Sequence, residues 1–204
     1  MEVRERIMEA ARKMFRSYGV KGVTMFDIAR ECGISKKTLY EHFEDKQSLI
    51  RESMNELLND HIQFAEKNHS DSANAIEELV NQMQFIRSKA RTLNPVMLFE
   101  IEKYHPETWK IVQRFQSDCI LTGIKDNLKR GMNEGIFRKN LNLEVTARMR
   151  QLQLEAAFDP IHYPADQYEI SSVMDEVTSH FILGVATLQG HKLAYQYLQI
   201  KEEE

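Results

Sequence analysis

The sequence predicts an all-α protein in which a small N-terminal three-helix unit precedes a larger helical body, with about nine helices in all. Two observations predict this fold class. The 204 residues include only 8 glycines and 4 prolines, so few positions interrupt a helix. Apolar residues also recur at intervals of three and four along nearly the whole chain, which is the period of one helix face.

The first four expected helices have recognisable boundaries. The first carries apolar residues on one face and stops at Gly19, because glycine accepts the positive φ that often ends a helix. The next three each begin with a side chain that can accept a hydrogen bond from a free backbone N–H. These caps are Thr24 with Asp27, then Ser35, then Asp45. The corresponding helices are expected to end near Gly33, His42 and Lys67.

Five more helices are expected in the remainder of the chain. The polar segment 69–72 breaks the pattern of the fourth helix. Asn94-Pro95 starts a sixth helix, and its apolar run 96–99 implies burial on most sides. The other expected spans are 76–90, Pro106 to about Met132, Asn142 to about Phe158 after the link 135–138, and Asp166 to about Leu198 with Gly190 as a point of interruption.

Charge is distributed unevenly along the chain. The net charge is −4, with 27 basic and 31 acidic residues. Residues 1–50 hold 10 basic and 8 acidic residues, a balance of +2, which leaves 17 against 23, or −6, for the remainder. A basic end on an acidic body is typical of a two-part DNA-binding protein, although the contrast here is small.

The cysteine pattern and the hydropathy favour a cytoplasmic protein. Cys32 and Cys119 fit no metal or redox spacing, so two unpaired thiols in a reducing compartment are the simplest interpretation. The first residues alternate in charge and precede no apolar segment of the kind found in signal peptides. No run of 18 apolar residues predicts a membrane span, and no membrane partner is expected.

The segment 24–43, TMFDIARECGISKKTLYEHF, has the organisation of a helix-turn-helix. Ala29 is small where two helices cross closely, and Gly33 suits the positive φ of the tight turn. The positions that fill the shared core between the two helices are Ile28, Cys32, Ile34 and Leu39.

Three lysines stand at the starts of neighbouring expected helices. Lys36 and Lys37 begin the third helix and Lys46 begins the fourth, where positive charge opposes the helix dipole by roughly 0.3–1 kcal/mol each. Solvated surface lysines are the alternative. The repetition favours an anionic ligand, and DNA phosphate is the obvious one, with the third helix in the major groove.

These residues resemble the signature of TetR/AcrR-type transcriptional regulators. The resemblance covers about residues 1–50 and rests on Thr24, Ile28-Ala29, Gly33-Ile34-Ser35, Thr38-Leu39-Tyr40, Phe43, Lys46 and Leu49. It implies a homodimeric repressor that binds a palindromic operator in double-stranded DNA and is released by a small apolar or amphipathic inducer. It also implies a DNA-binding domain at 1–46 and a ligand-binding and dimerisation domain at 47–204.

Carried onto this sequence, the resemblance implies a set of DNA contacts. Thr24, Tyr40 and Lys46 would contact phosphates, while Lys36, Lys37 and Thr38 would face base edges or nearby phosphates. Tyr40 has an alternative role as a core aromatic residue. The complete expected set is Thr24, Ser35, Lys36, Lys37, Thr38, Tyr40, His42 and Lys46.

The last and the eighth expected helices carry apolar stripes that could form a dimer interface. Two such helices from each chain would make a four-helix bundle across a two-fold axis, and Gly184 would allow close approach. Packing within the chain itself is the alternative. The expected interface residues are Met149, Leu152, Val173, Met174, Val177, Phe181, Gly184 and Leu188.

The middle helices are rich in methionine and aromatic residues, which line adaptable apolar cavities but also fill ordinary cores. Tyr104 and Trp109 are the strongest pocket candidates, because each combines an apolar body with a polar tip. Cys119 lies on an apolar helix face, where a buried thiol is expected. The expected pocket residues are Met83, Met97, Phe99, Tyr104, Trp109, Phe115 and Cys119.

An enzyme is not expected. Glu102 with His105, and Asp159 with His162, are carboxylate–histidine pairs at a suggestive spacing, and neither has a third ligand or a nucleophile. The chain has no glycine-rich phosphate loop, and no cofactor is expected. The alternative function is a helical protein-interaction module with neither DNA nor an inducer.

Overall fold

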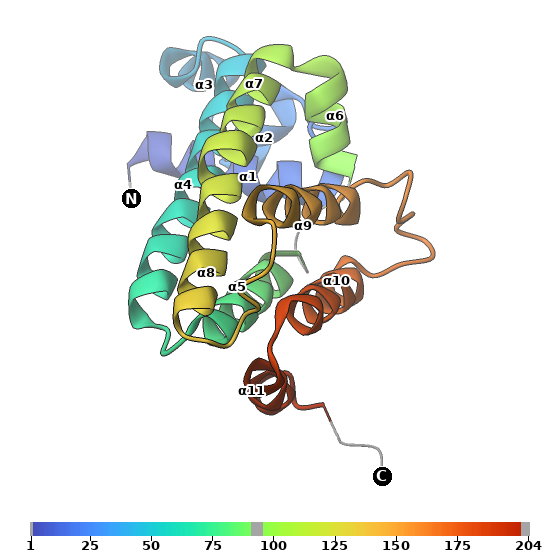
Figure 1. The fold of residues 1–204 in the computed structure, drawn as a ribbon. Coiled ribbons are helices and arrows are strands. Elements are labelled where there is room, and N and C mark those ends of the chain that lie inside the picture. Colours follow the sequence, from blue (N-terminus) through green and yellow to red (C-terminus); the bar gives the residue numbers. More distant parts are fainter. Residues whose placement is uncertain (1, 91–95, 201–204) are drawn as a thin grey trace. The chain divides into compact units, whose positions relative to one another are not determined.

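The computed structural model describes residues 2–90 and 96–200, and these form helices joined by turns and loops, of which the loop between Ala157 and Ile170 is long (Figure 1). The only β-pairing in this part of the chain is an isolated bridge between Phe137 and Ala186. The expected all-α fold class is therefore confirmed. The chain divides into two compact units, Met1–His61 with Thr92–Arg114, and Ile62–Arg91 with Phe115–Glu204.

The first unit is built around a single apolar core. Side chains from all six of its helices meet there, and Ile7, Ile28, Leu39 and Leu49 are completely buried. The helices of this unit are α1 (Val3–Tyr18), α2 (Met25–Glu31), α3 (Lys36–His42), the first part of α4 (Lys46–Asp71), α6 (Val96–Tyr104) and α7 (Pro106–Arg114).

The caps predicted for the first unit are present. The Thr24 hydroxyl accepts a hydrogen bond from the Asp27 N–H at 3.2 Å, and the Asp27 carboxylate accepts one from the Thr24 N–H at 3.0 Å. The Ser35 hydroxyl accepts from the Thr38 N–H at 3.0 Å, which caps α3. Gly19 follows α1 with φ +74°, as expected for a helix stop. Local sequence therefore determines where these helices begin and end.

The second unit has its own core of completely buried side chains, which include Ile76, Leu128, Phe137 and Ile182. Within it, α10 packs against α5 and α9, and α8 packs against α9. The helices of this unit are the end of α4, α5 (Ala75–Ala90), the π-helical turn η1 (Phe115–Ile120), α8 (Leu121–Asn133), α9 (Leu143–Ala157), α10 (Ile170–Val185) and α11 (Leu188–Leu198).

Two boundaries predicted in the middle of the chain are wrong. Helix α4 continues through the polar segment 69–71, because the Asn68 carbonyl still accepts a hydrogen bond from the Ser72 N–H at 3.0 Å. The helix expected from Pro106 to Met132 is divided into α7, η1 and α8. A π turn adds about one residue per turn, which side-chain periodicity over six residues does not reveal.

The expected start of the last helix is also wrong. Asp166 does not begin it, and α10 starts at Ile170 without a side-chain cap from Glu169. The interruption falls at Ala186–Thr187 instead of at Gly190.

Two links that are distant in sequence pair at this interruption. The Arg138 N–H donates to the Val185 carbonyl, and the Thr187 N–H donates to the Ile136 carbonyl, both at 2.9 Å. The Thr187 hydroxyl caps α11 by accepting from the Gly190 N–H at 3.1 Å, and it also donates to the Gly135 carbonyl at 2.9 Å. Long-range pairing therefore decides where the last helix breaks.

The apolar run 96–99 is not buried on most sides. Met97 lies in the core of the first unit, but Val96 and Phe99 are 41% and 37% exposed. The predicted cap and first turn at Asn94-Pro95 lie outside the described residues. None of the described helices is both long and apolar enough to span a lipid bilayer.

Candidate nucleic-acid interface

Helices α2 and α3 meet in the tight turn that the glycine pattern predicted. Gly33 has φ +63°, and the next residue, Ile34, donates its N–H to the Ala29 carbonyl at 3.0 Å. Below the turn, Ile28 and Leu39 are completely buried and Ala29 is nearly so. The Arg6 side chain from α1 donates to the Cys32 carbonyl at 2.6 Å and satisfies the end of α2. These contacts fix α3 on the other two helices.

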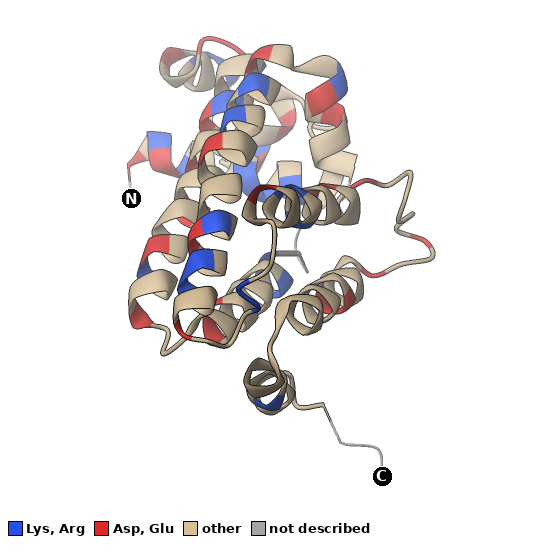
Figure 2. Cartoon of the chain, viewed as in Figure 1, with Lys and Arg blue, Asp and Glu red and all other residues tan. Residues whose placement is uncertain are grey.

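Helix α3 buries only one of its side chains, Leu39. Lys36, Lys37 and His42 are exposed, and Tyr40 is 50% exposed, so the alternative core role for Tyr40 is wrong. A seven-residue helix held through one leucine presents nearly its whole surface to solvent. Figure 2 shows both basic and acidic positions on α3.

The hydroxyl groups of the expected interface are already engaged in capping. The Thr24 hydroxyl donates to the Asp27 carboxylate at 2.5 Å, and these hydrogen bonds hold the pKa of Asp27 below its usual value. The hydroxyls of Ser35 and Thr38 lie 2.9 Å apart and bond to each other. To donate a hydrogen bond to a phosphate, the Thr24 hydroxyl would therefore have to give up its hydrogen bond to Asp27. The exposed lysines have no such bond to break.

Lys36 and Lys37 form no ion pair within residues 2–90 and 96–200. Lys46, the first residue of α4, is half-buried. Burial lowers the pKa of Lys46, and nearby Glu100 opposes that shift. The three lysines thus differ: Lys36 and Lys37 are exposed charges without an ion pair among the described residues, and Lys46 is partly desolvated.

The surroundings of Lys46 include residues that sequence reasoning missed. His105, between α6 and α7, places its Nδ1 2.7 Å from the side-chain oxygen of Gln47. Burial lowers the pKa of His105, and Lys46 lowers it further. Glu100 and His105 are more than 50 residues from Lys46 in sequence, so no local pattern could have predicted this proximity.

The expected pocket residues are divided between the two units. Met97, Phe99, Tyr104 and Trp109 belong to the first unit, and Met83, Phe115 and Cys119 to the second. A cavity of about 20 Å³ in the first unit is lined by Met97 and by none of the other six. This volume holds about one water molecule. The buried thiol expected at Cys119 is wrong, since that residue is exposed.

The expected dimer residues also fall into two groups. Val173, Met174 and Phe181 are buried within the second unit, so packing inside the chain is the role the structure gives them. Val177 is half-buried. On the exposed side, Met149 and Leu152 are 57% and 56% accessible, and Leu188 and Gly184 are also exposed. A partner contact stays a prediction for this exposed group.

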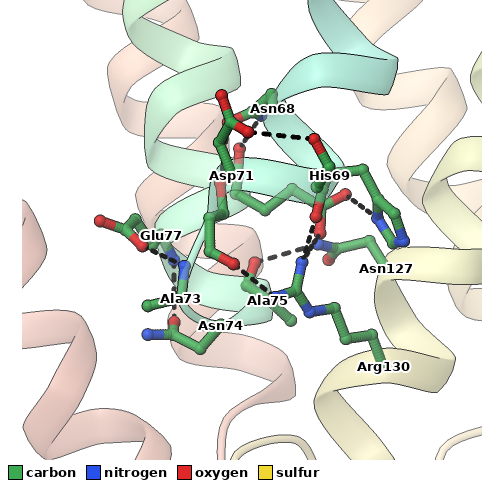
Figure 3. A network of polar contacts seen from close by, with 12 residues as sticks. Asn68, His69, Asp71, Ala73, Asn74, Ala75, Glu77, Asn127 and Arg130 are labelled. Carbon is green, nitrogen blue, oxygen red and sulfur yellow. Dashed lines mark hydrogen bonds and ion pairs between the residues drawn. The ribbon is translucent and has the colours of Figure 1, made fainter.

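A polar network that sequence analysis did not predict closes the α4–α5 turn of the second unit (Figure 3). Arg130 of α8 is at its centre and pairs with Glu78 at 2.9 Å and with Glu134 at 2.8 Å. It also donates to the carbonyls of His69 and Ser72, at 2.9 and 2.6 Å. The guanidinium thus satisfies carbonyls at the end of α4 that would otherwise lack donors.

The histidines do not form metal sites in the described part of the chain. His105 bonds to Gln47, and His162 bonds to Asp159 at 2.9 Å. Across residues 2–90 and 96–200, no cluster of three His, Cys, Asp or Glu side chains could hold a metal ion.

The geometry of the first unit defines a helix-turn-helix protein of the kind that binds DNA. A profile of the family "Bacterial regulatory proteins, tetR family" matches residues 7–53. An HTH-type transcriptional regulator of Staphylococcus aureus is 40% identical over 75 residues, which cover 35% of this chain and 40% of that protein. The chain thus matches well under half of that relative's length.

Longer similarities cover most of the chain at lower identity. The uncharacterized HTH-type transcriptional regulator YvaF of Bacillus subtilis is 22% identical over 84% of this chain and 90% of its own length. The structure of FadR from Bacillus subtilis with stearoyl-CoA gives a TM-score of 0.67 at 16% identity, over 89% of this chain and 98% of that one. A Saccharomonospora viridis putative regulator with choline gives 0.75 at 17% identity, over 90% and 97%. At these identities the structural likeness establishes the fold.

The helix-turn-helix, the family profile and the related regulators agree. Residues 7–53 therefore form a helix-turn-helix domain that matches the tetR family of bacterial regulatory proteins.

Proposed function

We propose that this protein is a transcriptional regulator, a homodimeric repressor that binds a palindromic operator through α3 and releases it when a small apolar or amphipathic inducer binds. The observation that carries the DNA-binding part is the exposure of α3, in which Leu39 is the one buried side chain and Lys36 and Lys37 are exposed without an ion pair among the described residues. A helix of this kind fits the major groove, where its first residues reach base edges. Residues 1–46 would form the DNA-binding domain and 47–204 the regulatory one.

The exposed side chains of α9 support the homodimer. Val145, Met149 and Leu152 recur at intervals of three and four, and each is more than half exposed. Large apolar residues that form a stripe on a helix surface are typical of an interface. Two helix-turn-helix units related by a two-fold axis would read the two halves of a palindromic site.

The inducer is the least defined part of this proposal. The compared FadR structure holds stearoyl-CoA and the Saccharomonospora viridis structure holds choline, so proteins of this fold bind chemically different ligands. The water-sized cavity of the first unit is too small for either molecule. We infer that an inducer opens space among the methionine and aromatic side chains of the middle helices. The cytoplasm follows as the location, since the regulator has to reach its DNA.

The experiment begins with selection of duplex DNA from a random pool by the wild-type protein. Binding of the enriched duplex is then measured against salt for the wild type and for Lys46→Ala. Loss of one phosphate contact should weaken binding to all sequences alike and reduce the slope of log K against log salt by about one. Lys110→Ala is the matched control, because Lys110 is an exposed lysine of the same unit that pairs with Glu107 at 2.7 Å.

Two results would contradict the proposal. If no duplex is enriched even at low salt, the protein is not a DNA-binding repressor, and the alternative of a protein-interaction module gains support. If Lys46→Ala and Lys110→Ala change the salt dependence equally, Lys46 has no phosphate role. An apolar protein partner would be distinguished by affinity that changes little with salt, because no counterions are released.

A further inference from the structure

Phe26 on α2 is an exposed aromatic residue that the expected DNA contacts do not include. Its neighbours Met25 and Ile28 are buried, whereas Phe26 is 51% exposed. Hydrophobic burial therefore does not explain the phenylalanine at this position. Its ring instead contacts two cations from different helices.

The cation contacts connect α2 to the start of α3. The ammonium nitrogen of Lys36 lies 4.7 Å from the centre of the Phe26 ring, and the guanidinium carbon of Arg30 lies 5.9 Å from it. Both distances are within the range in which the negative face of an aromatic ring attracts a cation. Arg30 is also held by Asp27 of the same helix at 3.5 Å, so the ring is the link specific to Lys36.

Lys36 is the first residue of α3, and its ammonium pairs with no carboxylate in the part of the chain that the structure describes. A lysine side chain has four rotatable bonds, and fixing it to contact a ligand loses up to about 2 kcal/mol of side-chain entropy. Contact with the Phe26 ring restricts the side chain before any ligand binds. For Lys37, the next residue, the structure shows no such aromatic contact among the residues it describes.

We propose that Phe26 is a positioning residue for DNA recognition, which holds the Lys36 ammonium at the start of α3 in the orientation that meets duplex DNA. This inference rests on the proposed DNA-binding function and adds a residue of α2 to it. Phe26 acts through Lys36 and not by its own contact with the bases. Removal of the aromatic face leaves Lys36 present but disordered, so affinity falls and the preference at the base pairs near Lys36 is relaxed.

The expected change in DNA affinity follows from the strength of an exposed cation–π contact, which corresponds to about a two- to fivefold change.

The test uses the duplex enriched by the wild-type protein and four variants: Phe26→Leu, Phe26→Trp, Lys36→Met, and the double variant Phe26→Leu with Lys36→Met. Phe26→Leu is expected to weaken binding about two- to fivefold, and Phe26→Trp is expected to retain it, because tryptophan has the strongest cation–π face. In the Lys36→Met background, Phe26→Leu should have no further effect.

Two controls separate this role from a structural one. Tyr18→Leu removes another exposed aromatic residue of the same unit and should leave binding unchanged. Thermal unfolding followed by circular dichroism should differ only slightly between Phe26→Leu and the wild type, because the ring is half exposed and an exposed cation–π contact is weak.

The outcomes distinguish this inference from the proposed function. If the wild type enriches a duplex but Phe26→Leu binds it equally well, Phe26 has no positioning role and only this inference is overturned. It is also overturned if Phe26→Leu weakens binding equally in the presence and absence of Lys36, since Phe26 then acts independently. If the wild type enriches no duplex, both this inference and the proposed function are overturned.

Discussion

The carboxylate of Glu100 accepts a hydrogen bond from the backbone N–H of Lys21 at 2.9 Å. This contact joins α6 to the turn between α1 and α2, across 79 residues of sequence. The same carboxylate lies against Gly19, where an added Cβ would be 2.6 Å from the Glu100 Oε2 atom. The turn that leads into the helix-turn-helix is therefore shaped around a side chain of α6.

Gly19→Ala is expected to destabilise the protein by about 2–3 kcal/mol, because the backbone has φ +74° and ψ 169° and the Glu100 carboxylate fills the space. Gly33→Ala is the control for φ alone, since Gly33 has φ +63° and no atom within 4 Å of an added Cβ. It should destabilise by about 1 kcal/mol. Urea unfolding measures both. Equal losses for the two variants would mean that Glu100 does not constrain the turn.

Stability should fall on acidification because of His61. Burial lowers the pKa of His61 from 6.5 to about 4. As the pH falls, His61 becomes protonated in the unfolded chain at a higher pH than in the folded protein. Its contribution to the free energy of unfolding is therefore complete above pH 6.5 and is lost as the pH falls towards 4. The largest loss is about 3 kcal/mol. His61→Leu should flatten the stability profile between pH 7 and 4.5 in urea titrations, and an unchanged profile would exclude His61 as its source.

Gly184→Leu tests the dimer surface without disturbing the chain's own core. No described atom lies within 4 Å of a Cβ built at Gly184, so the folded protomer has room for a larger side chain. If two copies approach closely at this glycine, leucine should dissociate the dimer or lower its affinity at least tenfold. Gly123→Leu is the matched control, because Gly123 has equally open surroundings on α8. Light scattering that finds Gly184→Leu as dimeric as Gly123→Leu would place the interface elsewhere.

Arg130→Met should destabilise the second unit by about 2–4 kcal/mol, because the Glu78 Oε2 atom and the carbonyls of His69 and Ser72 lose the guanidinium as their donor. Lys129→Met removes a neighbouring exposed charge that pairs with Asp126 at 3.1 Å, and it should change stability by less than about 1 kcal/mol. Thermal unfolding compares the two. A loss no larger than that of Lys129→Met would show that the network contributes little beyond a surface ion pair.

Local sequence predicted the features that depend on neighbouring residues. The caps at Thr24, Ser35 and Asp45 and the turn at Gly33 each involve atoms within four residues of one another. The exposure of α3 followed from the same pattern, since only one apolar position in it, Leu39, faces the shared core.

Features that depend on distant residues were missed. Glu100 beside Lys21 and Arg130 beside Glu78 are more than 50 residues from their partners, and no periodicity records such pairs. Apolar stripes also could not separate a chain's own core from a partner surface, because both need the same residues. Met174 is completely buried while Met149 is more than half exposed, although both lie on comparable stripes.

The pairing of the two short links at 135–138 and 185–187 limits how the chain can be shortened. Thr187 supplies donors to the Gly135 and Ile136 carbonyls while capping α11. Gly190, in the first turn of α11, has no room for a Cβ, which would lie 2.0 Å from the Ile136 oxygen. Cleavage after Val185 would remove the hydrogen-bond donors of the Gly135 and Ile136 carbonyls and expose the buried side chain of Phe137. A protease-resistant fragment should therefore retain α11, because this last helix is needed for the stability of the second unit.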